Sequence, residues 1–312
     1  MDQSTMTYIR YCVVSEILIF NILGVFGNIQ LLWTTYRKKS THSKPGYLLA
    51  VNAFVHIICL LFELVNATFL ISHHQPTRRY CYSIIAPYIF AVTLQAIIIL
   101  MKAVDLLLAL LFPMWYRIMP TREYVLALVL MSSICAGALA MWGWIARDNE
   151  IIAFCNPPLG LAPEVSRFWS MANVVVNSTV VALYVIIIAL VHFKGNTAAY
   201  RENRKVIRRL KAIVIIFVCS WYMAILGVNL GYVLGFSPEG LAIWQSNMVF
   251  FALVCYTQAF YVCIWRSLEY RIAFMEQLHM MVYWKQKRRV PTIGFVTLSK
   301  SRRLTTTMTS AK

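Results

Sequence analysis

The sequence has few charged residues. Aspartate, glutamate, lysine and arginine make up 13% of its 312 residues, about half the usual share of a soluble domain. This scarcity excludes an intrinsically disordered chain and a coiled coil, because both depend on abundant charge. Apolar residues make up 60%, and the mean hydropathy is +0.65. A water-soluble fold could not hide this excess, so we expect much of the apolar surface to face a lipid bilayer.

The sequence also lacks the short motifs of the common enzyme classes. It has no zinc-protease motif, phosphate-binding loop or nucleophile elbow. Its eight cysteines show no metal-ligand spacing, and no repeat of 20–50 residues indicates a solenoid. These absences favour a protein that is not an enzyme and carries no metal or other cofactor.

Seven apolar runs are each long enough to cross a membrane as a helix, which takes roughly 20 residues. Charged or turn-forming residues separate them, and Pro87 is the one proline inside a run. We therefore predict an all-α membrane protein with seven transmembrane helices at 11–36, 46–72, 83–111, 124–145, 168–193, 206–234 and 241–265. The expected domains are an external segment 1–10, the seven-helix domain 11–265 and a cytoplasmic helix with a basic tail at 266–312.

Lysine and arginine are distributed unevenly between the two sides of this bundle. Of 29 such residues, 23 lie on one side and five on the other, while Lys102 lies inside the third run. Cytoplasmic loops carry the excess of positive residues, so the amino terminus is expected outside and the tail inside. The net charge of +17 then reflects topology and not a nucleic-acid-binding surface. The first run is too long for a cleavable signal peptide and indicates a signal anchor.

Two cysteines fall on the predicted outer side, where disulfides persist. Cys81 lies just before the third run, and Cys155 lies in the loop between the fourth and fifth runs. A bond between them would pin this loop to the third helix.

These features describe a rhodopsin-like G-protein-coupled receptor, and shorter motifs narrow the resemblance. The sequence resembles the nematode serpentine chemoreceptors, most closely the Srsx class. The matching residues keep the order and spacing of that class across nearly the whole membrane domain: Gly27-Asn28, Arg37-Lys38-Lys39, Cys81-Tyr82, Gln95, Val104-Asp105, Phe112-Pro113, Tyr116-Arg117, Cys155-Asn156-Pro157-Pro158 and Arg266–Phe274.

The resemblance implies a chemosensory receptor in the plasma membrane, including the cilia of sensory neurons. It implies a Cys81–Cys155 disulfide, a small-molecule ligand in the outer half of the bundle, and a heterotrimeric G protein at the inner side. The dense positive charge of the third inner loop, including Arg204, Lys205 and Arg208, is expected to contact that G protein. A peptide receptor of the same fold and a membrane transporter remain as alternatives.

Several switch motifs of the receptor superfamily are altered here. Leu106 follows Asp105 where the superfamily has arginine, and His56 replaces its acidic residue in the second helix. Trp221 of the sixth helix has no proline near it, and Tyr261 is the only residue kept from the Asn-Pro-x-x-Tyr motif of the seventh. Coupling is therefore predicted from architecture and resemblance, not from intact switches.

Lys102 and Asp105 lie one turn apart in the third predicted helix. This spacing allows an ion pair, which we expect to replace part of the missing Asp-Arg pairing. Alternatively, the lysine extends its side chain toward the cytoplasm.

A polar stripe runs along one face of the second predicted helix, because its members follow a 4-3-4-3 spacing: Asn52, His56, Cys59, Glu63 and Asn66. It indicates either a functional interior surface or hydrogen bonding between helices, for instance from Asn28 to His56.

Candidate ligand contacts are polar residues in the outer halves of the helices: Tyr88, Asn173, Asn177, Asn229, Tyr232 and Gln245. Amine receptors of the superfamily carry an acidic residue near the place of Tyr88, and this chain does not. A small, mostly neutral ligand is therefore favoured over a cationic amine.

After the seventh run, apolar residues recur at helical spacing: Leu268, Ile272, Met275 and Val282. This pattern predicts an amphipathic helix on the inner membrane surface. The basic segment 285–289 either binds anionic lipid headgroups or is a solvated tail.

Overall fold

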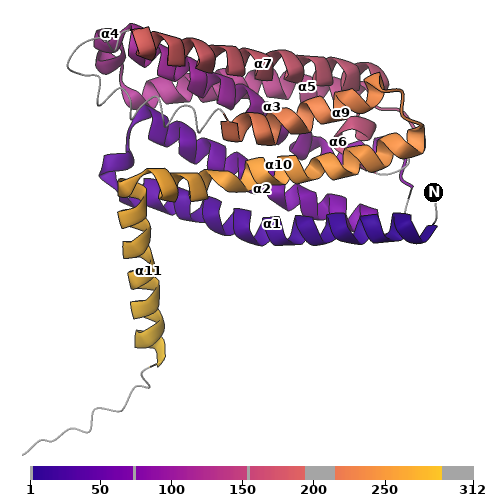
Figure 1. Ribbon diagram of the computed structural model, residues 1–312, viewed down its shortest axis with the longest axis horizontal. Coiled ribbons are helices and arrows are strands. Elements are labelled where there is room, and N and C mark those ends of the chain that lie inside the picture. The colour runs from indigo at the N-terminus through magenta and orange to yellow at the C-terminus, as the bar shows by residue number, and fades with distance from the viewer. Residues whose placement is uncertain (1–2, 73–74, 153–154, 194–214, 290–312) are drawn as a thin grey trace, which may run out of the picture.

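The computed structural model describes residues 3–72, 75–152, 155–193 and 215–289. Long helices run side by side along one axis, and one helix leaves the bundle across that axis (Figure 1). The elements are α1 (Gln3–Arg37), η1 (Lys39–Thr41), α2 (Lys44–Ser72), α3 (Arg78–Leu111), α4 (Pro113–Ile118), α5 (Thr121–Ala146), α6 (Pro157–Gly160), α7 (Pro163–Phe193), η2 (Val218–Tyr222), α9 (Met223–Val233), α10 (Pro238–Arg266) and α11 (Leu268–Arg289).

The seven-helix prediction agrees with this arrangement. Six helices among the described residues are long and apolar enough to cross a membrane, and a shorter apolar helix covers Ile215–Gly231. That shorter helix is the described part of the sixth predicted run, whose first residues, 206–214, lie outside the described residues. The predicted all-α membrane bundle is confirmed.

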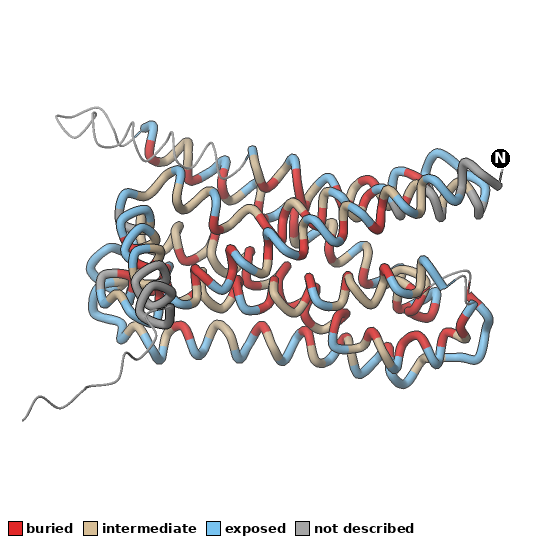
Figure 2. Tube along the Cα trace, turned by 90° about the horizontal axis from the view of Figure 1, so that it is seen from below, coloured by how far each residue is buried: buried red, intermediate tan, exposed pale blue. Residues whose placement is uncertain are grey.

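The third helix is the centre of the bundle. Half of the most apolar part of α3 is buried, against 22% for α5. α3 packs against α2, α5 and α7, while α1 contacts both α2 and α10 and so closes the ring. Figure 2 shows buried positions alternating with exposed ones along the long helices of the bundle. The exposed side chains include large apolar ones such as Ile22, Ile134 and Val185, as expected for helices that face lipid.

The Gly27-Asn28 motif joins α1 to α10. The Asn28 amide donates hydrogen bonds to the carbonyl oxygens of Gly24 and Tyr256, each at 2.9 Å. A Cβ atom on Gly27 would come within 2.9 Å of Phe260, so glycine permits the close approach of the two helices. The predicted Asn28–His56 bond is wrong, because His56 is bonded to Asn52 on its own helix at 3.1 Å.

α11 docks against the end of α1 and points away from the bundle (Figure 1). The Gln277 amide donates to Thr34 Oγ1 at 2.9 Å, and Lys38 forms an ion pair with Glu276. On another face Leu268, Ile272 and Met275 are exposed. A helix after the seventh run is thus confirmed, and its place on the inner membrane surface stays a prediction. The side chains of Val282 and of segment 285–289 lie outside what the structure describes.

Candidate functional sites

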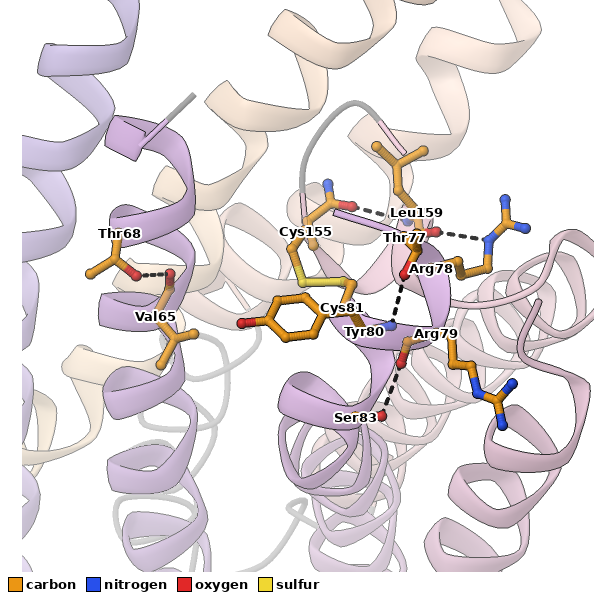
Figure 3. Close-up of a disulfide and its surroundings, with 11 residues drawn as sticks. Val65, Thr68, Thr77, Arg78, Arg79, Tyr80, Cys81, Ser83, Cys155 and Leu159 are labelled. Atoms are coloured by element: carbon orange, nitrogen blue, oxygen red, sulfur yellow. Dashed lines mark hydrogen bonds between the residues drawn. A yellow bond between two sulfur atoms is a disulfide. The ribbon is translucent and has the colours of Figure 1, made fainter. Parts of the chain in front are cut away.

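One end of the bundle is covered by the loop between α5 and α7. The predicted disulfide between Cys81 and Cys155 is present (Figure 3). The Arg78 guanidinium pairs with the carboxylates of Asp148 and Glu150, and the Arg78 backbone N–H donates to the Glu150 carbonyl at 2.7 Å. These contacts fix the loop across the start of α3, and we call this end of the molecule the disulfide end.

The short helix α6 lies directly against the disulfide. Asn156 begins it, because its side-chain oxygen accepts a hydrogen bond from the Leu159 N–H at 2.9 Å. A Cβ atom on Gly160 would lie 2.5 Å from Ile85 Cδ1 and 3.0 Å from the Cys81 sulfur, so a larger residue would push these neighbours apart. The Cys155-Asn156-Pro157-Pro158 motif therefore shapes the segment that covers the disulfide end of the bundle, which we call the roof.

A pocket of about 90 Å³ lies beneath this roof, and we call it the disulfide-end pocket. α2 and α3 contribute Glu63 and Tyr88 to its wall. The Tyr88 hydroxyl donates to one Glu63 carboxyl oxygen, and the Asn66 amide donates to the other at 3.0 Å. Apolar and aromatic side chains complete the lining, including Val92, Trp169, Trp221, Ala224, Ile225, Met248, Val249, Ala252 and Tyr256.

Two buried N–H donors in the lining have no hydrogen-bond partner among the described residues. They are the Trp221 indole Nε1 and the Gln245 amide Nε2, from side chains that are 2% and 4% exposed. A buried donor without a partner costs free energy, so each is available to a ligand acceptor.

Trp221 lies on a π-helical turn, η2, at the place where the sequence lacks the proline of the superfamily. The Ser220 hydroxyl of this turn donates at 2.6 Å to the carbonyl oxygen of Ile216, which precedes the turn. π-Turns are often found at functional sites. Here the turn supplies a local irregularity without proline, and it places Trp221 in the pocket wall.

The structure separates the predicted ligand contacts. Tyr88 and Gln245 line the disulfide-end pocket. Asn173 and Asn177 are buried on α7 and donate to backbone carbonyls of their own helix, at 2.8 and 2.7 Å. Asn229 lies in a separate groove of about 690 Å³, where it accepts a hydrogen bond from Ser170 at 2.8 Å. The side chain of Tyr232 lies outside the described part of the chain.

Sequence reasoning did not place Glu63, Trp169, Trp221 or Tyr256 among the ligand contacts. The polar stripe of the second helix carried a signal for Glu63, because it put Glu63 on an interior face. No sequence pattern distinguishes the three aromatic residues from ordinary core residues.

A polar cluster occupies the opposite end of α3. The Tyr116 hydroxyl donates to the Asp105 carboxylate at 3.1 Å, and the Lys44 ammonium donates to the Tyr116 carbonyl. The same ammonium lies 3.9 Å from the centre of the Tyr116 ring and 4.9 Å from that of Tyr124. Burial and the neighbouring carboxylate raise the pKa of Tyr116, which keeps its hydroxyl protonated as a donor.

The predicted Lys102–Asp105 ion pair is wrong. The ion pairs among the described residues are Lys38–Glu276, Arg78–Asp148 and Arg78–Glu150. Three residues along a helix leave a rotation of about 60° between side chains, and here each side chain follows its own tertiary surroundings. Asp105 contacts Tyr116 of α4, whereas Lys102 lines a cavity against α2 and α10.

The match to a known family decides the class of this bundle. The family described as serpentine type 7TM GPCR chemoreceptor Srsx matches residues 21–278, more than four fifths of the chain. The chain belongs to the Srsx family. No curated protein matches it. This Srsx chain is therefore a serpentine chemoreceptor of the G-protein-coupled class, which is not an enzyme class, and its spanning helices make it a multi-pass membrane protein.

Of the remaining coupling residues predicted for the Srsx receptor, the structure describes Tyr261. Tyr261 donates from its hydroxyl to the Leu23 carbonyl of α1 at 3.1 Å, which ties α10 to α1. Arg204, Lys205 and Arg208 lie outside the described residues, so their contact with a G protein stays a prediction.

Proposed function

We propose that this Srsx receptor binds a small, mostly neutral molecule in the disulfide-end pocket and signals to a heterotrimeric G protein from the opposite end. The carrying observation is an aromatic pocket in which two buried N–H donors lack partners. Few, well-placed polar groups in an aromatic lining are typical of small-molecule sites.

The polar groups of the pocket favour a ligand with a hydrogen-bond acceptor. Both oxygens of the Glu63 carboxyl already accept hydrogen bonds from Tyr88 and Asn66. The lining groups without partners among the described residues are two donors, Trp221 Nε1 and Gln245 Nε2, and one acceptor, Asn66 Oδ1. A carbonyl, ester or ether oxygen would satisfy the two donors. The volume of about 90 Å³ lies below the range of about 300–1,000 Å³ for drug-sized ligands, which favours a compact molecule over a peptide.

We place the disulfide end outside the cell and the Asp105 cluster inside. A disulfide persists on the oxidising side of a membrane. The side with 23 lysines and arginines is the one that includes Lys44 and the third inner loop, as the positive-inside rule requires. This orientation puts the amino terminus outside and the basic tail in the cytoplasm.

The effect of ligand binding is transmitted to the inner side by the helices that form the pocket. Trp221 lies on η2, and Gln245 lies on α10. η2 is itself tied to α10, because the Gln258 amide donates to Ser220 at 3.3 Å. A ligand that binds both donors better in one packing of these helices shifts the population toward that packing.

The test is a signalling assay in cells that express the receptor with an amino-terminal tag. A panel of compact ketones, esters and ethers is applied, with hydrocarbons of matched size as controls. The proposal predicts tag staining on intact cells and G-protein-dependent responses to acceptor-bearing compounds. Uptake of a labelled compound without any G-protein response would favour the transporter instead.

A further inference from the structure

A second cavity, of about 300 Å³, lies between the helices in the half of the bundle away from the disulfide. α2, α3, α7 and α10 supply its polar lining, which is Asn52, His56, Lys102, Tyr184, Gln258, Cys255 and Cys263. We call it the inner cavity. It shares no described lining residue with the disulfide-end pocket, and its lining contains Lys102 where that of the disulfide-end pocket contains Glu63.

Lys102 gives the inner cavity a positive charge without a counter-charge. The described lining contains no aspartate or glutamate. Lys102 forms no ion pair with any described residue, and Asp105 is engaged by Tyr116 on another side of α3. A desolvated ammonium inside a membrane protein is costly unless an anion or polar groups surround it.

Neighbouring polar side chains are also incompletely bonded. His56 is 2% exposed, and its Nε2 faces the Asn52 amide at 3.1 Å. Because the amide nitrogen can only donate, Nε2 accepts and the ring proton lies on Nδ1. That buried Nδ1 has no partner among the described residues. The cavity therefore combines a cation and an unused N–H donor with two amide oxygens, Asn52 Oδ1 and Gln258 Oε1, that lack partners among the described residues.

We propose that the inner cavity binds a small monovalent anion, with Lys102 as its counter-charge and the His56 Nδ1–H as a hydrogen-bond donor. The shared chemistry is a single negative charge, borne either by chloride or by the carboxylate of a short fatty acid. By neutralising Lys102 between α2, α3 and α10, the anion stabilises the packing of these helices. This site is separate from the proposed ligand pocket and does not depend on chemosensory activity.

Thermal unfolding of the purified full chain in detergent tests this site, followed by tryptophan fluorescence. Chloride is titrated against gluconate at constant sodium, and sodium octanoate forms a second arm below its micellar concentration. Wild type is expected to gain about 2–6 °C in Tm with saturation. A larger gain at lower concentration with octanoate would identify the carboxylate as the occupant, and a gain with chloride alone would identify the halide.

Three variants make the result specific to Lys102. Lys102→Met should lose the response and melt above wild type in gluconate, because the uncompensated charge is gone. Lys102→Arg keeps the charge and should keep a response. Lys39→Met removes an exposed cation and should respond as wild type does. The absence of a saturable gain in wild type, or an equal gain in Lys102→Met, would overturn the proposal.

Discussion

The Tyr116 hydroxyl donates a hydrogen bond to the Asp105 carboxylate across 3.1 Å, from a helix outside the spanning bundle. Lys44 adds a cation to the same cluster from the start of α2, and its positive charge attracts the Asp105 carboxylate. The carboxylate that pairs with a neighbouring arginine in the receptor superfamily is thus held here by a tyrosine and a lysine. Leu106 is compatible with this arrangement because the partners come from other elements.

Removing the Tyr116 hydroxyl should weaken the resting state. In Tyr116→Phe the buried Asp105 carboxylate loses its donor, at a cost of about 1–3 kcal/mol. We expect a lower Tm in detergent and higher ligand-free signalling at matched surface expression. Tyr36→Phe, at a side chain that is 81% exposed, is the control and should change neither quantity. Unchanged basal signalling in Tyr116→Phe would show that this cluster takes no part in holding the resting state.

A pair of double-mutant cycles tests which lysine serves Asp105. Leu106→Arg supplies the partner found in the superfamily. Combined with Lys44→Met, it should give non-additive effects on basal signalling, with a coupling of about 0.5–3 kcal/mol. Combined with Lys102→Met, it should give additive effects, because Lys102 lies in the inner cavity. Additive effects with Lys44→Met and non-additive effects with Lys102→Met would show instead that Lys102 serves Asp105.

Loss of the Cys81–Cys155 bond should destabilise the roof of the ligand pocket. Cys81→Ser, Cys155→Ser and the double variant should each lose about 2–5 kcal/mol of stability, with no further loss in the double variant. The readouts are surface level and Tm. Cys135→Ser changes an exposed free cysteine and is the matched control. Additive losses from the two single variants would show that each cysteine acts independently.

The basic third inner loop is expected to contact the G protein. Replacing Arg204, Lys205 and Arg208 by glutamine should reduce signalling while three neighbouring cations still hold the orientation. Replacing Lys300, Arg302 and Arg303 removes the same charge from the same side and should have little effect. Wild-type signalling and surface level in the loop variant would contradict this contact.

Hydropathy predicted the spans better than their ends. α3 begins at Arg78 and not at position 83, because Thr77 caps it and acidic loop residues bury Arg78. Hydropathy does not register a polar turn that is stabilised by residues 70 positions away. The same limit explains why the predicted Lys102–Asp105 pair is wrong. Helical spacing suggested Asp105 as the partner of Lys102, but contacts from Tyr116 and Lys44 determine where the Asp105 carboxylate is bound.

Sequence periodicity was more informative for the polar interior. The stripe on the second helix correctly grouped Glu63 with Asn52 and His56 on the inward face. It could not reveal that Glu63 joins the disulfide-end pocket while His56 joins the inner cavity, because the division is made by residues of α3 and α10.

The most direct measurement of the central claim is the ligand concentration that gives half-maximal signalling in Gln245→Leu and Trp221→Phe. Each change removes an unpartnered N–H donor of the pocket. For an acceptor-bearing ligand found in the panel, each should raise this concentration about 10-fold, equivalent to about 1.4 kcal/mol. Gln30→Leu alters a similarly buried glutamine on α1 and is the control. A shift of that size in the two pocket variants alone supports the proposed ligand site, and responses identical to wild type in both would contradict it.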